Sequence, residues 1–500
     1  MTEADSAKPV ETLQRKKFRT ALAGLMLAIV LSSLDQNIVA TALPRIASDL
    51  GDVSQIPWIV TAFMLSATTT TPIYGKLSDM YGRRSLFMCS IGIFLAASAL
   101  CSLASDMLQM VMFRAMQGAG AGGLITLSQS AIGDLVGPRE RGRYQGLFSG
   151  AMAVSTVAGP LLGGLLLAMM SWRWIFLVSL PLGALALLFV MTALPAAPRP
   201  KSHRIDTPGV VFWVIGMSSA MVFLSAIGSA GSPSALYPVA TGVLAVAFIS
   251  LFLRREWTAP EPILSLRLFK IPSFAIGVAA AGAMSFAMQA AMVFLPLYFQ
   301  AVLGQSPTES GLMLLPQVAG MIVSATWGGR HSVRSGQFKR YLVVGVGLET
   351  VALALLVMCA LMKAGSPPFL VALAILGLGT GLGMPNAVVI VQNAVPRETL
   401  GSATGSMSFV RSLGGAVGVA LSGCVMRFVL GSGSTMPGFE GFTVDRALRV
   451  FPGDGEGIHP MAEALRFAIA SSFAFGAAMM LAALVTCAAL PARVPASHDD

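Results

Sequence analysis

The chain has 500 residues, of which 55% are hydrophobic and only 11% are charged. A soluble domain usually has about 25% charged residues, so this composition excludes an ordinary soluble protein. The net charge of +10 would suit a nucleic-acid-binding protein, but the positions of the basic residues argue against that class.

Apolar stretches of about twenty residues recur along the chain, and this length crosses roughly 30 Å of hydrocarbon as a helix. We predict fourteen transmembrane helices, separated by charged or Pro/Gly-rich breaks. Their approximate ranges are 20–42, 57–75, 86–105, 108–133, 146–170, 173–195, 208–228, 236–253, 272–299, 308–328, 341–361, 367–391, 402–426 and 465–490. The expected fold class is therefore an all-α polytopic membrane protein.

Lysine and arginine gather on one side of this predicted topology. Of the 33 basic residues, 24 fall in segments on the same side as the N-terminus, seven fall on the opposite side and two lie inside predicted helices. Cytoplasmic loops retain positive charge, so both termini are predicted to be cytoplasmic and the protein to lie in the cell membrane. The same rule accounts for the basic charge without nucleic acid.

Four ionisable residues fall inside predicted helices, where an unpaired charge costs several kcal/mol. They are Asp35, Arg114, Glu349 and Arg411. At 1.5 Å per residue, Asp35 lies about 22 Å along its helix and Arg114 about 9 Å below the outer surface, which gives them a similar depth. Glu349 and Arg411 are both expected near the midplane. Each acid and base is a candidate for proton or substrate binding, or else a structural ion pair.

The longest predicted outer segment, 431–460, is rich in glycine and proline and has little apolar periodicity. Two interpretations stay open for it. The segment is either a passive connector or a lid over an outer vestibule.

Residues 75–84 follow the second predicted helix and contain Gly75, Asp79, Gly82, Arg83 and Arg84. This spacing resembles the loop signature of the major facilitator superfamily. Within that superfamily, the chain is most similar to the fourteen-helix drug and proton antiporters, and the resemblance extends from about residue 18 to 491. It implies that residues 75–84 form a cytoplasmic latch that opens as two halves rock.

Two further segments resemble motifs of the same family. Residues 34–44, which include Asp35, resemble the helix 1 motif of fourteen-helix members. Arg114, Gln117 and Gly118 are similar to the helix 4 motif, whose arginine is implicated in proton coupling. These three residues share one helix face, so a polar stripe is expected to face a neighbour rather than lipid.

The helix 5 motif of exchangers is matched by Gly159, Pro160, Gly163 and Gly164, where glycines and one proline bend and pack the helix. Ser155 stands in place of the usual middle glycine of that motif. In the second half, residues 328–334 occupy the position of the first latch but lack its aspartate, which puts a gating role there in doubt.

The resemblance implies two six-helix bundles with two additional helices inserted between them. The expected divisions are a cytoplasmic tail at 1–19, a bundle at 20–195, inserted helices at 196–270, a bundle at 271–490 with the outer loop 431–460, and a tail at 491–500. The resemblance also implies a monomer that works by alternating access and uses the proton motive force without a cofactor. Its partners would be the lipid bilayer, a small-molecule substrate and protons.

The predicted activity is export of hydrophobic, often cationic, small molecules in exchange for protons. A carboxylate at Asp35 can be neutralised by a proton or by a cation, and this competition would couple the two flows. A dedicated exporter of one metabolite, lipid or siderophore is the main alternative. A membrane enzyme or channel is a remote one, because the four histidines fall in loops or tails and no nucleophile elbow or ATP-binding P-loop is present.

The topology is testable by thiol labelling in a background without the five native cysteines. Single cysteines within 75–82 or 137–142 should react slowly with an impermeant reagent in intact cells, because these loops are predicted to be cytoplasmic. Cysteines within 431–460 should react quickly. Equal rates at all three places would overturn the predicted orientation.

Overall fold

The structure is a computed structural model that describes residues 3–51, 56–138, 140–195, 206–228, 236–259, 261–432 and 458–490. Most of the predicted outer loop 431–460 and the whole predicted tail 491–500 lie outside these residues. The first ten residues of the predicted inserted segment, 196–205, lie outside them as well.

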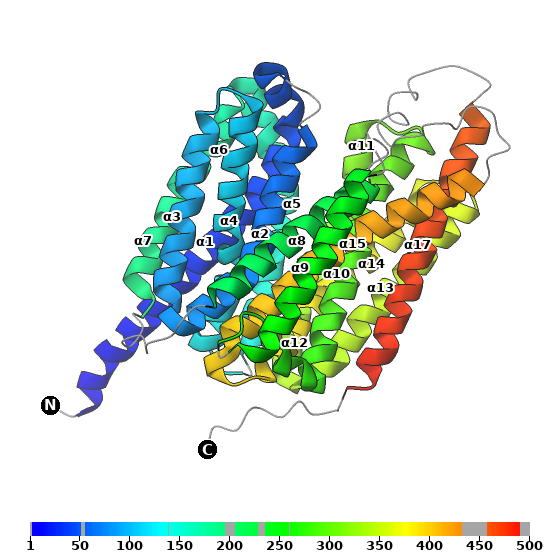
Figure 1. Cartoon of the computed structure of the whole chain (residues 1–500). Helices are drawn as coiled ribbons and strands as arrows, with labels where there is room; N and C mark the ends of the chain where they lie inside the picture. Colours follow the sequence, from blue (N-terminus) through cyan, green and yellow to red (C-terminus); the bar gives the residue numbers. More distant parts are fainter. Residues whose placement is uncertain are drawn as a thin grey trace.

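All the regular elements of the described residues are helices (Figure 1). They are α1 (Glu3–Leu50), α2 (Ile56–Tyr81), α3 (Arg83–Ser102), α4 (Met107–Leu135), α5 (Arg141–Met169), α6 (Arg173–Leu177), α7 (Ser179–Ala193), α8 (Thr207–Gly228), α9 (Leu236–Thr258), η2 (Leu266–Lys270), α10 (Pro272–Ala301), α11 (Pro307–Leu312), α12 (Leu315–Ser335), α13 (Phe338–Leu361), α14 (Ser366–Asn393), η3 (Arg397–Thr399), α15 (Leu400–Ser432) and α17 (Ile458–Ala488). The predicted all-α class is confirmed.

Twelve helical spans in this part of the chain are both long and apolar enough to cross a membrane. The predicted fourteen include α2 and α4, which have 26 and 29 residues but are more polar. In α2, the hydroxyls of Thr69 and Thr71 donate to carbonyls one turn earlier, each at 2.7 Å. In α4, polar side chains such as Gln117 and Gln129 are buried. These two helices therefore turn their polar groups towards protein rather than lipid.

The helices form two bundles. Buried apolar side chains of α1 to α7 make up the cores of one bundle, and those of α10 to α17 make up the core of the other. The bundles meet where α2 packs on α15 and α5 packs on α12. These contacts lie towards the end of the molecule at which α1 begins, which we call the proximal end, and the ribbons diverge towards the opposite end (Figure 1).

Glycine makes the contact between the bundles unusually close. A β-carbon placed on Gly75 would lie 2.5 Å from the carbonyl oxygen of Gly401, and one on Gly146 would lie 2.4 Å from that of Ala325. No larger residue fits at these separations, so backbone packs directly on backbone.

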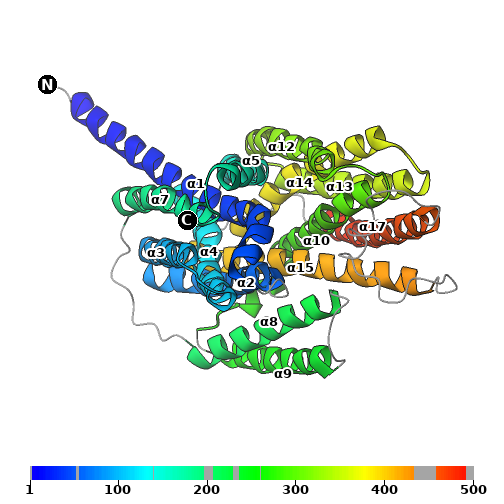
Figure 2. The same ribbon diagram turned by 90° about the horizontal axis from the view of Figure 1, so that it is seen from above.

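The pair α8 and α9 lies between the bundles in chain order, but in space it lies on one flank of the molecule (Figure 2). There, α8 packs against α2 of one bundle and α15 of the other. The two helices are therefore central in the order of the chain but not in its three-dimensional arrangement. The flanking position leaves the contact between α5 and α12 on the other side of the molecule uncovered by this pair.

Trp213 of α8 joins the two bundles. Its indole Nε1 donates to the carbonyl of Thr69 in α2 at 2.7 Å, and its ring centroid lies 4.6 Å from that of Phe409 in α15. Pro72 in α2 has no N–H for the carbonyl of Thr68, so the helix is already weakened next to the bonded carbonyl. Trp213 supplies a donor at this weakened turn.

Replacing Trp213 with phenylalanine should destabilise the protein by about 1 kcal/mol, because the buried indole donor is lost while an aromatic ring is kept. Thermal or denaturant unfolding of the purified chain would measure the change. Trp174→Phe is the matched control, because Trp174 is 47% exposed. Equal effects of the two substitutions would contradict the bridging role of the Trp213 hydrogen bond.

Candidate functional site

Asp35 of α1 and Arg114 of α4 form a direct ion pair, with Nη1 of Arg114 2.7 Å from Oδ2 of Asp35. Gln117, one turn along α4, donates from Nε2 to Oδ1 of Asp35 at 2.9 Å and accepts a hydrogen bond from Arg114. The exposed fractions of Asp35, Arg114 and Gln117 are 2%, 2% and 0%. The two carboxylate oxygens therefore have separate donors in a site closed to solvent in this conformation.

Neighbouring helices complete this site. The guanidinium of Arg114 lies 4.2 Å from the ring centroid of Phe63 in α2, and its Nε is 3.5 Å from the carbonyl of Ile59. Nε2 of Gln117 also lies 3.1 Å from Oγ of Ser98 in α3. A cation held against an aromatic face and a carboxylate is stabilised in a low-dielectric site. The site thus depends on four helices of one bundle.

Glu349 and Arg411 are not brought together. Glu349 in α13 is fully buried and accepts a hydrogen bond from Oγ1 of Thr380 in α14 at 2.6 Å. Its Oε2 has no hydrogen-bond partner among the described residues. Arg411 lies half-buried in α15, and the described residues include no ion pair of this arginine. The two residues are therefore separate features, and Glu349 is a buried acid that has no paired cation among the described residues.

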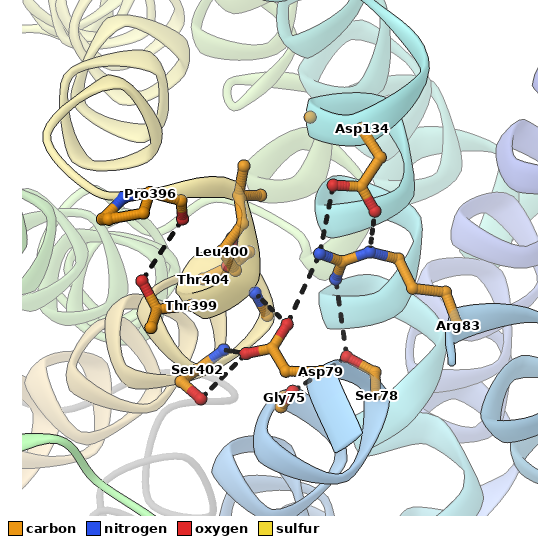
Figure 3. A network of polar contacts seen from close by, with 12 residues as sticks. Gly75, Ser78, Asp79, Arg83, Asp134, Pro396, Thr399, Leu400, Ser402 and Thr404 are labelled. Carbon is orange, nitrogen blue, oxygen red and sulfur yellow. Dashed lines mark hydrogen bonds and ion pairs between the residues drawn. The ribbon is translucent and has the colours of Figure 1, made fainter. Parts of the chain in front are cut away.

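Asp79 reaches from the end of α2 to the start of α15 (Figure 3). Its Oδ1 accepts from the backbone N–H of Gly401 at 2.8 Å, and its Oδ2 accepts from the N–H and the hydroxyl of Ser402 at 2.7 and 2.9 Å. The first N–H groups of a helix lack partners within it and favour a negative charge. Asp79 therefore caps a helix of the opposite bundle.

The other latch residues serve this contact in different ways. Gly82 ends α2 with a φ of 87°, a conformation that favours glycine. Arg83 forms an ion pair with Asp134 of α4 and a longer one with Asp79, at 3.5 Å (Figure 3). Nε of Arg84 is buried without a hydrogen-bond partner among the described residues. Arg83 thus connects the capping carboxylate to α4.

The motif glycines divide between helix contacts and exposed positions. A β-carbon on Gly118 would lie 2.2 Å from the carbonyl oxygen of Phe63, so this glycine allows α4 to approach α2. Similarly, β-carbons on Gly159 and Gly163 would lie 2.4 Å from Cβ of Asn37 and 2.2 Å from Oγ1 of Thr41. Pro160 and Gly164 lie on the exposed side of α5. Half of the helix 5 motif therefore packs against α1.

Sequence reasoning missed Arg141, which it counted only as a loop charge. Arg141 is 3% exposed and donates to the carbonyl of Gly133 at 2.7 Å, to the carbonyl of Gln392 at 2.9 Å and to Oδ1 of Asn393 at 2.8 Å. Gln392 in turn donates to the carbonyl of Gln129 at 3.0 Å. This network joins the ends of α4 and α14. The polar Gln-Asn pair at the end of an apolar helix was its only sequence signal.

The profile of the Major Facilitator Superfamily matches residues 25–419. The chain belongs to the major facilitator superfamily. Two solved members of similar fold are the human organic anion transporter MFSD10, with a TM-score of 0.61, and a mutant of XylE, with a TM-score of 0.66. Each is 14% identical in sequence; MFSD10 aligns over 95% of this chain and 99% of its own, and XylE over 97% of both.

Curated relatives of this facilitator-superfamily protein are named as transporters. Multidrug transporter protein MdtP of Bacillus subtilis is 34% identical over 83% of this chain and 76% of its own length. Multidrug resistance protein 3 of the same species is 31% identical over 83% and 80%. Efflux pump FUS6 of Gibberella moniliformis is 32% identical over 84% and 76%. The protein is thus a multi-pass membrane transporter of this superfamily and not an enzyme.

The cap on α15 is testable with Asp79→Asn. Asparagine lacks the negative charge and one of the two acceptor oxygens of aspartate. The substitution should therefore destabilise the conformation described here by about 2 kcal/mol. Substrate export by cells should fall about tenfold, while the amount of protein in the membrane, measured by immunoblot, stays near normal.

Asp134→Asn is the matched control, because it removes the other acid bonded to Arg83 and leaves the cap in place. Its effect on export should be clearly smaller. Loss of the Asp79→Asn protein from the membrane in proportion to its activity would mean that Asp79 serves folding rather than the transport cycle.

Proposed function

We propose that this transporter exports hydrophobic, in part cationic, small molecules from the cell in exchange for protons, by alternating access. The observation that carries the proposal is the buried network of Asp35, Arg114 and Gln117. The multidrug and efflux relatives support the direction of transport and the broad substrate class.

The proposed coupling depends on competition for one carboxylate. Asp35 has a guanidinium at 2.7 Å as its counter-charge in this conformation. A proton on Asp35 would neutralise the acid and weaken its attraction to Arg114, and a cationic substrate would compete with both for the same oxygens. Because proton and substrate cannot both neutralise the acid, the release of one favours the binding of the other.

The arrangement of the bundles supports alternating access. Asp79, Arg141 and the glycine contacts join the bundles towards the proximal end, while the ribbons diverge towards the opposite end (Figure 1). We place the proximal end in the cytoplasm on the basis of the charge distribution. The described conformation would then be closed to the cytoplasm, and breaking these contacts would begin the change to the opposite state.

The role of Asp35 is testable in everted membrane vesicles with a pH-sensitive dye and a cationic substrate. Asp35→Asn should abolish substrate-induced proton release, because the amide cannot be protonated in this range. Asp35→Glu should keep part of the activity with a shifted pH profile. Arg114→Ala should change the pH dependence more than Arg411→Ala, because only Arg114 contacts the acid.

Glu349→Gln provides the second arm of this experiment, since Glu349 is a buried acid for which the described residues include no paired cation. The Glu349→Gln variant should release protons at close to the parental rate. If Asp35→Asn releases protons at the parental rate and Glu349→Gln does not, the coupling site is Glu349. The susceptibility of a deletion strain to a panel of dyes and antibiotics would separate the two kinds of exporter. Loss of a broad exporter should increase sensitivity to many compound classes, and loss of a dedicated exporter to one class only.

A further inference from the structure

The ends of α2 and α12 are built alike, although they belong to different bundles. Each helix is followed by a glycine with positive φ, Gly82 at 87° and Gly336 at 68°. Seven residues earlier, each has a glycine whose added β-carbon would lie 2.5 to 2.7 Å from a carbonyl of the other bundle, Gly75 against Gly401 and Gly329 against Gly142. The contact of α12 with α5 therefore repeats the contact of α2 with α15.

The two contacts differ at the position of the capping carboxylate, which only the first contact has. Asp79 stands three residues before Gly82, and Val333 stands three residues before Gly336. Both contact the equivalent glycine of the facing helix: a β-carbon on Gly401 would lie 2.4 Å from Oδ1 of Asp79, and one on Gly142 would lie 3.3 Å from Cγ2 of Val333. The second contact has a valine at the position of the anionic group.

A cavity of about 380 Å³ lies at this place, lined by Glu140, Arg143, Arg330, Val333 and Arg334. Arg143 belongs to α5, and Arg330 and Arg334 belong to α12, so cations of both bundles meet here. None of the three arginines forms an ion pair within the described residues. Three guanidiniums against one carboxylate leave an excess of positive charge that no side chain of the cavity neutralises.

We propose that this cavity binds a phosphate-bearing anion that joins the two bundles in the way that Asp79 joins them at the first contact. Guanidinium groups match phosphate oxygens with paired hydrogen bonds, which makes arginine well suited to this ligand. The cavity lies where α5 begins and α12 ends, at the level expected for lipid headgroups. The favoured source is therefore an anionic phospholipid, and free phosphate is the other source of the same chemistry.

The phosphate site is independent of whether Asp35 carries protons, so it needs its own test. The purified full chain is placed in nanodiscs of phosphatidylcholine, with or without phosphatidylglycerol, and thermal unfolding is followed. Phosphatidylglycerol should raise the Tm by about 3 °C, because a ligand that binds only the folded state stabilises it. The double substitution Arg330→Gln and Arg334→Gln should remove this rise. Arg143→Lys should keep part of it, since the charge remains.

The matched control is the double substitution Arg254→Gln and Arg340→Gln, which removes two exposed charges on the same predicted side of the membrane without touching the cavity. This control should keep the full rise in Tm. An equal loss of the rise in both double variants would reduce the effect to general surface charge and overturn the site.

Val333→Asp provides a test in the opposite sense, because it places a carboxylate at the position of Asp79. This variant should be more stable than the parent in phosphatidylcholine alone and should respond less to phosphatidylglycerol. Millimolar inorganic phosphate in phosphatidylcholine nanodiscs identifies the source: the same rise in Tm assigns the site to free phosphate, and no rise assigns it to lipid. A parent that responds to neither anion contradicts the proposal.

Discussion

Direct backbone contact between the two bundles is the constraint on which the whole junction at the proximal end depends. Gly75 lies so close to Gly401 that no side chain fits between them, and Gly329 lies similarly close to Gly142. Short side chains can reach across only because the backbones are this near. Asp79 has three heavy-atom bonds from its backbone to its oxygens, yet it bonds two N–H groups of the opposite bundle. A larger residue at Gly75 or Gly401 would separate the capping acid from its helix.

The sequence predicted the depth of the ionisable side chains in the membrane better than it predicted which neighbours they face. Helix rise is constant, so counting residues placed Asp35 and Arg114 at one level, and the structure joins them in an ion pair. The same count placed Glu349 and Arg411 at one level, but Glu349 faces Thr380 of α14 instead. Depth does not specify which neighbour a side chain faces, because that depends on how the helices are rotated and packed. The functional roles of all four residues stay predictions.

Long-range contacts were the part that the sequence could not supply. Arg141 looks like an ordinary loop charge, because its partners Gln392 and Asn393 lie about 250 residues away in the chain. Most of the membrane-length helices were predictable from apolar stretches, but the flanking position of α8 and α9 was not. Trp213 contacts Thr69 and Phe409 in that position, and no periodicity in the sequence indicates these partners.

The flanking pair makes the two sides of the molecule unequal towards the bilayer. On one side, α8 and α9 cover the line where α2 meets α15 (Figure 2). On the other side, α5 and α12 carry exposed apolar side chains, such as Leu161, which is 69% exposed, and Val323, which is 62% exposed. Of these two lines of contact between the bundles, helices of the chain itself therefore border one, and the other is left for the lipid bilayer to border.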